Sequence, residues 1–171
     1  MTAEAKPVNE KSTNSQELAK GEVMQFLTFS VSGAEYGVDI MAVREIKGWT
    51  EATRMPNSPE YMRGVINLRG VVIPIFDLRT RFGMGVTLAE SKHVVVVMAV
   101  ANRTIGVLAD AVSDILTVQA SEIKSAPVSD TTIDKEFING LISVQDKMVV
   151  LLNVENLFEI DQIPANVEKA S

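Results

Sequence analysis

The sequence predicts a mainly β protein made of two tandem copies of one small β-barrel, with short helices and a C-terminal helix. Short β-branched runs alternate with turn-forming residues, one hairpin pattern occurs twice, and 171 residues suffice for two small barrels that share an interface. We expect a first barrel over residues 22–86 and a second over residues 87–160, with an exchange of elements between the barrels left open. Polar segments at 1–21 and 161–171 are expected to form a disordered N-terminal tail and a frayed C-terminal tail.

The most constrained stretch of the chain is a predicted β-hairpin. Two apolar, β-branched runs at 65–68 and 71–75 flank the turn-forming pair Arg69 and Gly70. Both faces of the second run are apolar, so we expect this strand to be covered on both sides. Pro74 lacks an N–H, so we expect it at a sheet edge or barrel corner, with its nitrogen turned away from the pairing. Arg69 would stand at the hairpin tip, where a long cation has no packing role.

This hairpin pattern returns later in the chain. Residues 64–78 match residues 140–154 without a gap, at an offset of 76 (140 minus 64). A second match, between the segments around Gly37 and Gly106, has an offset of 69 (106 minus 37). The difference predicts a longer loop in the second half, which we place within 125–135. We therefore interpret the chain as two copies of one small β domain, the alternative being chance similarity between Val-rich strands.

The elements before the first hairpin follow from local patterns. Alternation of apolar and polar residues at 23–31 predicts a strand, and a turn at 32–33 leads to a second strand at 35–38. Asp39 is then expected to cap a short helix over residues 40–46. The apolar face of this helix, which we expect to be core rather than interface, carries Ile40, Val43 and Ile46.

Proline and glycine residues divide the rest of the chain into elements. Pro59 fits the first position of a helical turn, and Gly83 fits the end of a short helix. The valine run that begins at Val94 predicts a strand buried on both faces. In chain order, we expect a strand at 48–54, a helical turn from Pro59, the hairpin, a helix at 77–82, a strand at 94–100, the second hairpin and a closing helix at 154–160.

Composition excludes several classes of function. The chain has no cysteine, so it has neither a disulfide framework nor a cysteine-ligated metal, which fits a reducing cytosol. It has no run of about 18 apolar residues and no N-terminal apolar core of signal-peptide length, so we expect a soluble, unexported protein without membrane insertion. A net charge of −6 argues against binding to nucleic acid or to anionic membranes, which both need clustered cations.

No catalytic, metal or cofactor site is predicted. His93, the single histidine, is interpreted as a strand-end residue, because no second histidine or cysteine completes a metal or acid–base site. The glycine-containing run at 83–85 lacks the lysine and the Ser or Thr of a phosphate-binding loop. We therefore expect a protein that is not an enzyme.

Four arginines form a local basic cluster in an otherwise acidic protein, and two interpretations stay open. The cluster is either a docking site for acidic groups of a partner or a set of solvated loop charges. Arg69 is its strongest member because of its place at the hairpin tip, and Glu45, on the expected helix, is near enough in principle to pair with it. The members are Arg63, Arg69, Arg79 and Arg81.

Residues 67–79, with the sequence NLRGVVIPIFDLR, resemble the bacterial chemotaxis coupling protein family, CheW. The similarity extends upstream through 35–46 and downstream through 110–115 and 140–141. It covers the chain from residue 24 to about residue 160. The NLRG hairpin is the most specific of these motifs.

Members of this family consist of two small five-stranded β-barrels, SH3-like or OB-like, and have no catalytic activity. They link the cytoplasmic tips of chemoreceptors (methyl-accepting chemotaxis proteins) to the histidine kinase CheA, whose regulatory domain has a related fold. The resemblance therefore implies a cytoplasmic adaptor that is recruited to membrane-associated receptor arrays. Adaptors of other receptor–kinase pathways, such as pilus motility, share the pattern. A small barrel that binds single-stranded nucleic acid is a rival of another class, but one Trp, two Tyr and the negative charge argue against it.

The resemblance also implies three contact sites. A receptor helix would lie in the groove between the barrels, which is helix-in-groove recognition, and an apolar patch on the first barrel would bind the kinase. A second, weaker kinase contact through the other barrel would close units into rings. The receptor candidates are Glu45, Ile46, Arg69 and Val112. The kinase candidates are Leu27, Ile40 and Val43. The candidates for the weaker contact are Lys124 and Ser129.

Overall fold

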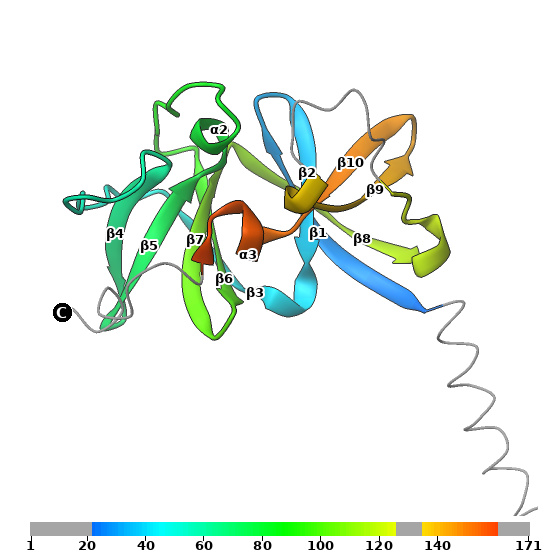
Figure 1. Ribbon diagram of the computed structural model, residues 1–171, viewed down its shortest axis with the longest axis horizontal. Coiled ribbons are helices and arrows are strands. Elements are labelled where there is room, and N and C mark those ends of the chain that lie inside the picture. Colours follow the sequence, from blue (N-terminus) through cyan, green and yellow to red (C-terminus); the bar gives the residue numbers. More distant parts are fainter. Residues whose placement is uncertain (1–21, 126–134, 161–171) are drawn as a thin grey trace, which may run out of the picture.

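The computed structural model describes residues 22–125 and 135–160, and two five-stranded sheets dominate it (Figure 1). The strands are β1 (Val23–Val31), β2 (Ala34–Asp39), β3 (Val43–Gly48), β4 (Met62–Leu68), β5 (Val71–Asp77), β6 (Val94–Val100), β7 (Arg103–Ala109), β8 (Ala111–Gln119), β9 (Ile138–Val144) and β10 (Lys147–Leu152). The short helices are α2 (Leu78–Arg81) and α3 (Val154–Leu157), and the 3-10 turns are η2 (Ile40–Ala42), η3 (Ala120–Glu122) and η4 (Lys135–Phe137). The expected mainly β fold with short helices is thereby confirmed.

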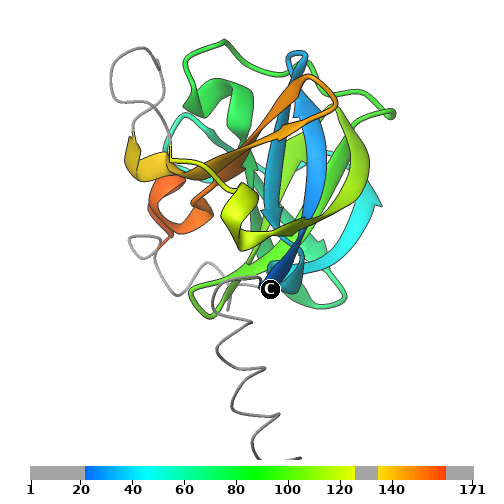
Figure 2. The same ribbon diagram turned by 90° about the vertical axis from the view of Figure 1, so that its right-hand side faces the viewer.

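Each sheet combines strands from both copies of the repeat. The strand order is β8–β1–β2–β10–β9 in sheet A and β3–β6–β7–β5–β4 in sheet B. The two copies have therefore exchanged their first hairpins, β1–β2 and β6–β7, and the expected division into residues 22–86 and 87–160 does not separate the two sheets. The joins are parallel ladders between β2 and β10 and between β5 and β7. Figure 2 shows the first of them, where the β1–β2 hairpin lies beside β10.

The sheets are strongly curved but are not closed barrels. In sheet B the edge strands β3 and β4 are linked through the segment after β3, where Thr53 forms a bridge to Val65. Sheet A has the corresponding bridge between Lys124 and Leu141. The offset between the copies is 71 at Thr53 and Lys124 (124 minus 53) and 76 at Val65 and Leu141 (141 minus 65). Most of the extra length of the second copy therefore lies between Lys124 and Leu141, and residues 126–134 of it are outside the described part.

Both hairpins have the same two-residue turn, which explains why their sequences match. Arg69 and Gly70 have φ of 52° and 89°, and Gln145 and Asp146 have φ of 48° and 65°. Two successive left-handed residues form the turn whose twist matches that of paired strands. The predicted hairpins are confirmed in position.

Pro74 lies in an inner strand rather than at a sheet edge, because β5 pairs with both β4 and β7. Its partner across the ladder is Val65, whose N–H and C=O are both used by Thr53 on the other side of β4 (2.8 Å each). The missing N–H of Pro74 therefore removes no bond to β4. The prediction was a sheet edge or a barrel corner, and the edge alternative was wrong because β5 is an inner strand.

Two local predictions in the first half were wrong. Asp39 does cap a turn, since its Oδ1 accepts the Met41 N–H (2.9 Å), but the turn is only η2, and the chain then enters β3 in place of a helix over 40–46. β-branched Val43 begins a strand whose residues are alternately half-buried and exposed, and pairing with β6 overrides the helical spacing. The expected strand at 48–54 is likewise absent, apart from the bridge at Thr53.

The main hydrophobic core lies where the two sheets meet. Phe76 of sheet B stacks on Phe158, which follows α3, with ring centres 4.7 Å apart and planes within 10°. α3 itself lies between the sheets (Figure 1) and buries Val154 and Leu157 in this core. It is shorter than the expected helix over 154–160. One smaller apolar cluster belongs to each sheet. In the described part of the chain, no helix is long and apolar enough to span a membrane.

Candidate partner-binding surface

Arg69 and Glu45 form an ion pair at the tip of the first hairpin. Arg69 Nη2 donates to Glu45 Oε2, although β3 and the β4–β5 tip belong to opposite edges of sheet B. The curvature of the sheet brings these edges together. The Arg69 side chain is 72% exposed and that of Glu45 is 30% exposed. The hydrogen bond to Glu45, together with its charge, raises the pKa of the Arg69 guanidinium.

The other two receptor candidates lie apart from this ion pair. Ile46 follows Glu45 on β3, so its side chain points to the opposite face of the strand, where it is 43% exposed. Val112 is half-buried on β8 of sheet A, opposite Phe29 of β1, and packs against the core between the sheets. The structure thus joins Glu45 to Arg69, and it places the Ile46 side chain on the other face of β3 and Val112 in the other sheet.

The predicted kinase patch is only partly at the surface. Leu27 is 2% exposed and belongs to the core between the sheets, so it does not offer a contact to a partner. Ile40 and Val43 are half-buried and pack against the same core. Met41, which the sequence reasoning missed, stands between them and is 78% exposed. The capped turn at Asp39 is the signal that could have revealed it, because such a turn cannot bury every side chain.

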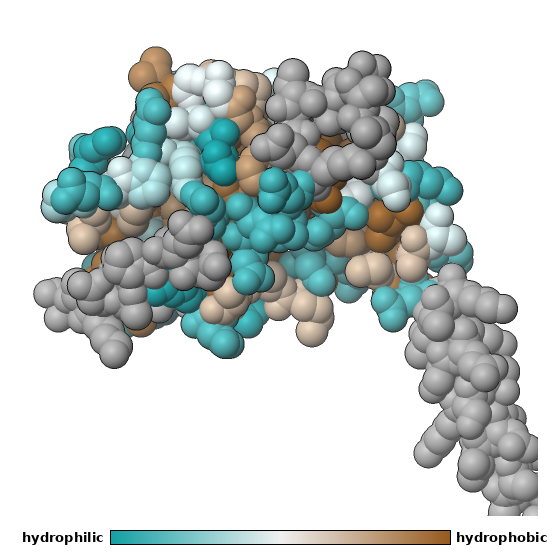
Figure 3. Space-filling view, in the orientation of Figure 1, coloured by the Kyte–Doolittle hydropathy of each residue, from teal (hydrophilic) through white to brown (hydrophobic). Residues whose placement is uncertain are grey.

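The predicted weaker kinase contact is described only in part. Lys124 is exposed, and its backbone is paired with Leu141 of β9. Its Nζ lies 3.4 Å from the Ser121 carbonyl oxygen. Ser129 lies outside the described residues. On the face shown in Figure 3, apolar residues form small separate groups between polar ones.

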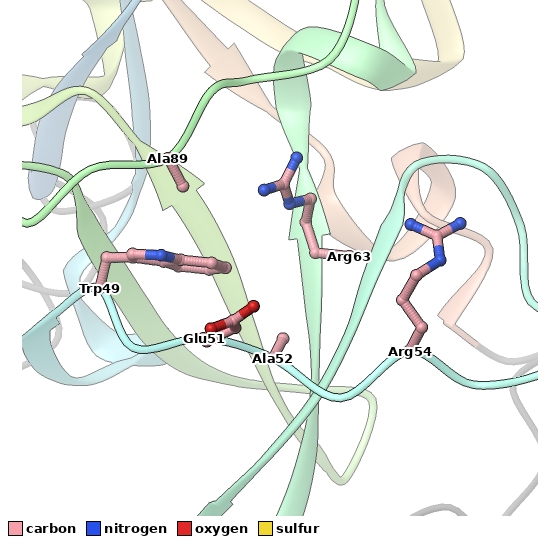
Figure 4. A pocket seen from close by; sticks show the side chains of 6 residues that line it. All are labelled: Trp49, Glu51, Ala52, Arg54, Arg63 and Ala89. Atoms are coloured by element: carbon pink, nitrogen blue, oxygen red, sulfur yellow. The ribbon is translucent and has the colours of Figure 1, made fainter.

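Arg63, one of the four clustered arginines, is used within the fold. Its Nη1 donates to the Thr87 carbonyl oxygen (2.7 Å) and lies 3.7 Å from Asp77 Oδ2. Its guanidinium lies 5.5 Å from the centre of the Trp49 ring. Figure 4 shows both groups at a hollow of about 390 Å³. The residues that line this hollow are Trp49, Glu51, Ala52, Arg54, Arg63 and Ala89.

Arg79 and His93 meet at Asp110, where the chain passes from sheet B to sheet A. Arg79 Nη2 lies 3.3 Å from both Asp110 carboxylate oxygens, Oδ2 of which also accepts the Ser32 N–H (2.9 Å). His93 is buried, with Nε2 3.5 Å from Asp110 Oδ1 and Nδ1 accepting the Glu90 N–H (2.9 Å). His93 is therefore a buried residue next to the start of β6, which agrees with its interpretation as a strand-end residue. Among the described residues, no group of three or more His, Cys, Asp or Glu is arranged to hold a metal ion.

Arg81 is also held internally. Its Nε donates to the Leu157 carbonyl oxygen (2.5 Å), and its guanidinium lies 4.9 Å from the centre of the Tyr61 ring and 4.6 Å from that of Phe137. Arg63, Arg79 and Arg81 therefore make contacts within the fold, so the interpretation as solvated loop charges was wrong for these three, while the docking interpretation stays a prediction. Arg69 is the member of the cluster that projects into solvent.

Comparisons with known proteins identify the family. The family model of the CheW-like domain matches residues 25–162. The probable chemotaxis protein CheW of Rhizobium etli is 44% identical over 134 residues, which are 78% of this chain and 86% of that protein. The chemotaxis protein CheW of Rhizobium meliloti is 41% identical over 138 residues, which are 81% of this chain and 89% of that protein.

A solved structure shows the same fold. The crystal structure of the scaffolding protein TtCheW from Thermoanaerobacter tengcongensis superposes with a TM-score of 0.74 at 31% identity, and covers 83% of this chain and 92% of that one. The resemblance drawn from the NLRG hairpin is thereby confirmed. The chain belongs to the CheW family of chemotaxis scaffold proteins.

Proposed function

We propose that this protein is a non-catalytic, cytoplasmic adaptor that couples the tips of chemoreceptors to the histidine kinase CheA and supports the assembly of receptor–kinase arrays. Its family and the scaffolding role named for TtCheW support a binding function. The same surface would serve an adaptor of another receptor–kinase pathway. Identification of the receptor that the protein binds would distinguish the two functions.

The observation that carries the receptor part of the proposal is the exposed cation at the tip of the first hairpin. Arg63, Arg79 and Arg81 are committed to internal partners, whereas the Arg69 side chain is 72% exposed and held by one carboxylate. A fixed, solvent-facing guanidinium suits recognition of polar or acidic groups on a receptor helix. Ile46, exposed on the other face of β3, would supply an apolar contact, and Val112 would line the groove from the other sheet.

For the kinase, we propose a surface centred on Met41. This side chain is exposed on η2, and half-buried Ile40 and Val43 flank it. An exposed methionine adapts its shape to an apolar partner at small cost. Leu27 would act only by supporting this surface from the core. Lys124 and Ser129 stay candidates for the weaker contact.

The test is the reversal of charge at Arg69. Arg69→Glu is expected to abolish binding to a receptor cytoplasmic fragment and stimulation of CheA by receptor-containing membranes, while the fold is kept. Exposed ion pairs contribute little to stability, so the circular dichroism spectrum and the unfolding midpoint should stay close to those of the parent. Binding measured by titration calorimetry and CheA autophosphorylation, with and without attractant, would show the effect.

Two further variants make this test specific. Arg54→Glu makes the same change of charge at an exposed residue of the hollow beside Trp49, and it should bind receptor like the parent. The double variant Glu45→Arg with Arg69→Glu restores an ion pair with the two charges exchanged. It should not restore binding, because the charge exposed to the receptor at position 69 would then be negative. Parental binding and kinase stimulation by Arg69→Glu would overturn the proposed receptor site.

A further inference from the structure

Arg69 is held in a backbone conformation that its residue type rarely adopts. Its φ of 52° lies in the left-handed region, which Gly, Asn and Asp tolerate best. Gly70, the next residue, has φ of 89°, and the pair Leu68 and Val71 closes the turn on both sides. The direction of the Arg69 side chain therefore depends on how firmly this two-residue turn is kept.

Asn67 holds the turn from within the hairpin. Its side-chain Oδ1 accepts the Gly70 N–H at 2.8 Å. That N–H belongs to the peptide group that joins Arg69 to Gly70, so the bond fixes the orientation of the backbone on the C-terminal side of Arg69. Side chains of Asn commonly stabilise turns in this way.

The second hairpin supplies a natural comparison. Ser143 occupies the position that corresponds to Asn67, 76 residues further on (143 minus 67). The turn after it also has two successive residues in the left-handed conformation, Gln145 and Asp146. A turn of this kind therefore forms without an asparagine. Because the fold does not need Asn67 to make the turn, its hydrogen bond is available for another role.

We propose that Asn67 is a positioning residue for Arg69 and, through it, a determinant of receptor affinity. The inference rests on the proposed receptor site. Arg69 is anchored at two ends: Glu45 binds its guanidinium, and Asn67 fixes its backbone. Both anchors restrict a long, exposed side chain before the receptor arrives, which lowers the entropy lost on binding.

The experiment is a double-mutant cycle with Asn67→Ala and Arg69→Ala, read by binding to a receptor cytoplasmic fragment. Asn67→Ala alone is expected to weaken binding roughly 2- to 12-fold, the change that one hydrogen bond commonly contributes. In the Arg69→Ala background it should have no further effect, because there is no side chain left to position. Asn67→Asp, which keeps the acceptor oxygen, should bind more tightly than Asn67→Ala.

Controls separate this role from a structural one. Ser143→Ala changes the matching position of the second hairpin and should leave binding unchanged. Exchange of the Gly70 amide hydrogen should become faster in Asn67→Ala, with the unfolding midpoint close to that of the parent. An equal loss of affinity in both backgrounds, or parental affinity of Asn67→Ala while Arg69→Ala binds weakly, would overturn the inference. Unchanged binding of Arg69→Ala would instead overturn the proposed receptor site.

Discussion

Gly106 allows the two copies of the repeat to join in sheet B, so its replacement by alanine should destabilise the protein. It lies on β7, opposite Ile75 of β5, in the parallel ladder that links the copies. A Cβ at this position would lie 2.6 Å from both Ile75 Cδ1 and Val95 Cγ1. Both neighbours are buried, so neither can turn into solvent to make room.

The expected size follows from the cost of overpacking a core. Adding a methyl group where no space exists costs about 1–3 kcal/mol, and two contacts at 2.6 Å place Gly106→Ala in the upper part of that range. Gly37 is the equivalent residue of sheet A, and its Cβ would lie 2.9 Å from Leu151 Cδ2 and 3.3 Å from Val149 Cγ1. Gly37→Ala should therefore cost less, about 1 kcal/mol.

Gly48 provides the matched control. A Cβ there would meet no heavy atom within 4 Å, and its φ is not in the left-handed region. Gly48→Ala should leave stability unchanged or raise it by about 0.4–1 kcal/mol, because alanine restricts the unfolded chain. Equilibrium urea unfolding, followed by circular dichroism and by fluorescence of the single Trp, gives the free energies. Equal stability of Gly106→Ala and Gly48→Ala would refute the view that Gly106 is required at the join.

Two further predictions concern the ionisation of Tyr61 and the dependence of each sheet on both halves of the chain. Burial raises the pKa of Tyr61 to about 12, and the hydrogen bond to Glu159 and the charge of Glu159 add to this. In the unfolded chain the Tyr61 hydroxyl ionises at its ordinary pKa of 10.0, so stability should fall as the pH rises from 10.0 towards 12. Tyr61→Phe should make this fall shallower, leaving the contribution of Tyr36, whose pKa is also raised by burial; an unchanged slope in urea unfolding across that window would contradict the assignment. Fragments 1–85 and 86–171 should each fail to fold alone and should regain a β spectrum when mixed, because each sheet needs strands from both; cooperative unfolding of one isolated fragment would disprove this dependence.

The sequence was most informative where structure is local. The β-branched runs and the pair Arg69 and Gly70 specify a hairpin within a few residues, and both hairpins were predicted at their true positions. The exchange between the copies was not predictable in the same way. The β1–β2 hairpin has the same pattern whichever copy it joins, and its partner β10 follows it by more than a hundred residues. Gly37 and Gly106 are the local sequence features that mark the joins between the copies, because each lies where a parallel strand approaches closely.

The candidate site shows the same limit at the level of side chains. Arg63, Arg69, Arg79 and Arg81 look alike in sequence, and only tertiary structure separates their roles. The acceptors of the three internal arginines, Thr87, Asp110 and Leu157, lie 24, 31 and 76 residues further along the chain, so no local pattern could indicate them.

This difference has a consequence for mutagenesis of the cluster. Loss of an internal arginine leaves a carbonyl or a carboxylate without its donor, so it should lower stability first and binding second. Arg69 pairs with a partly exposed Glu45, which water can solvate when the arginine is removed. Loss of receptor binding without loss of stability is therefore the pattern expected at Arg69, and it is what separates a contact residue from the three arginines that are bonded within the fold.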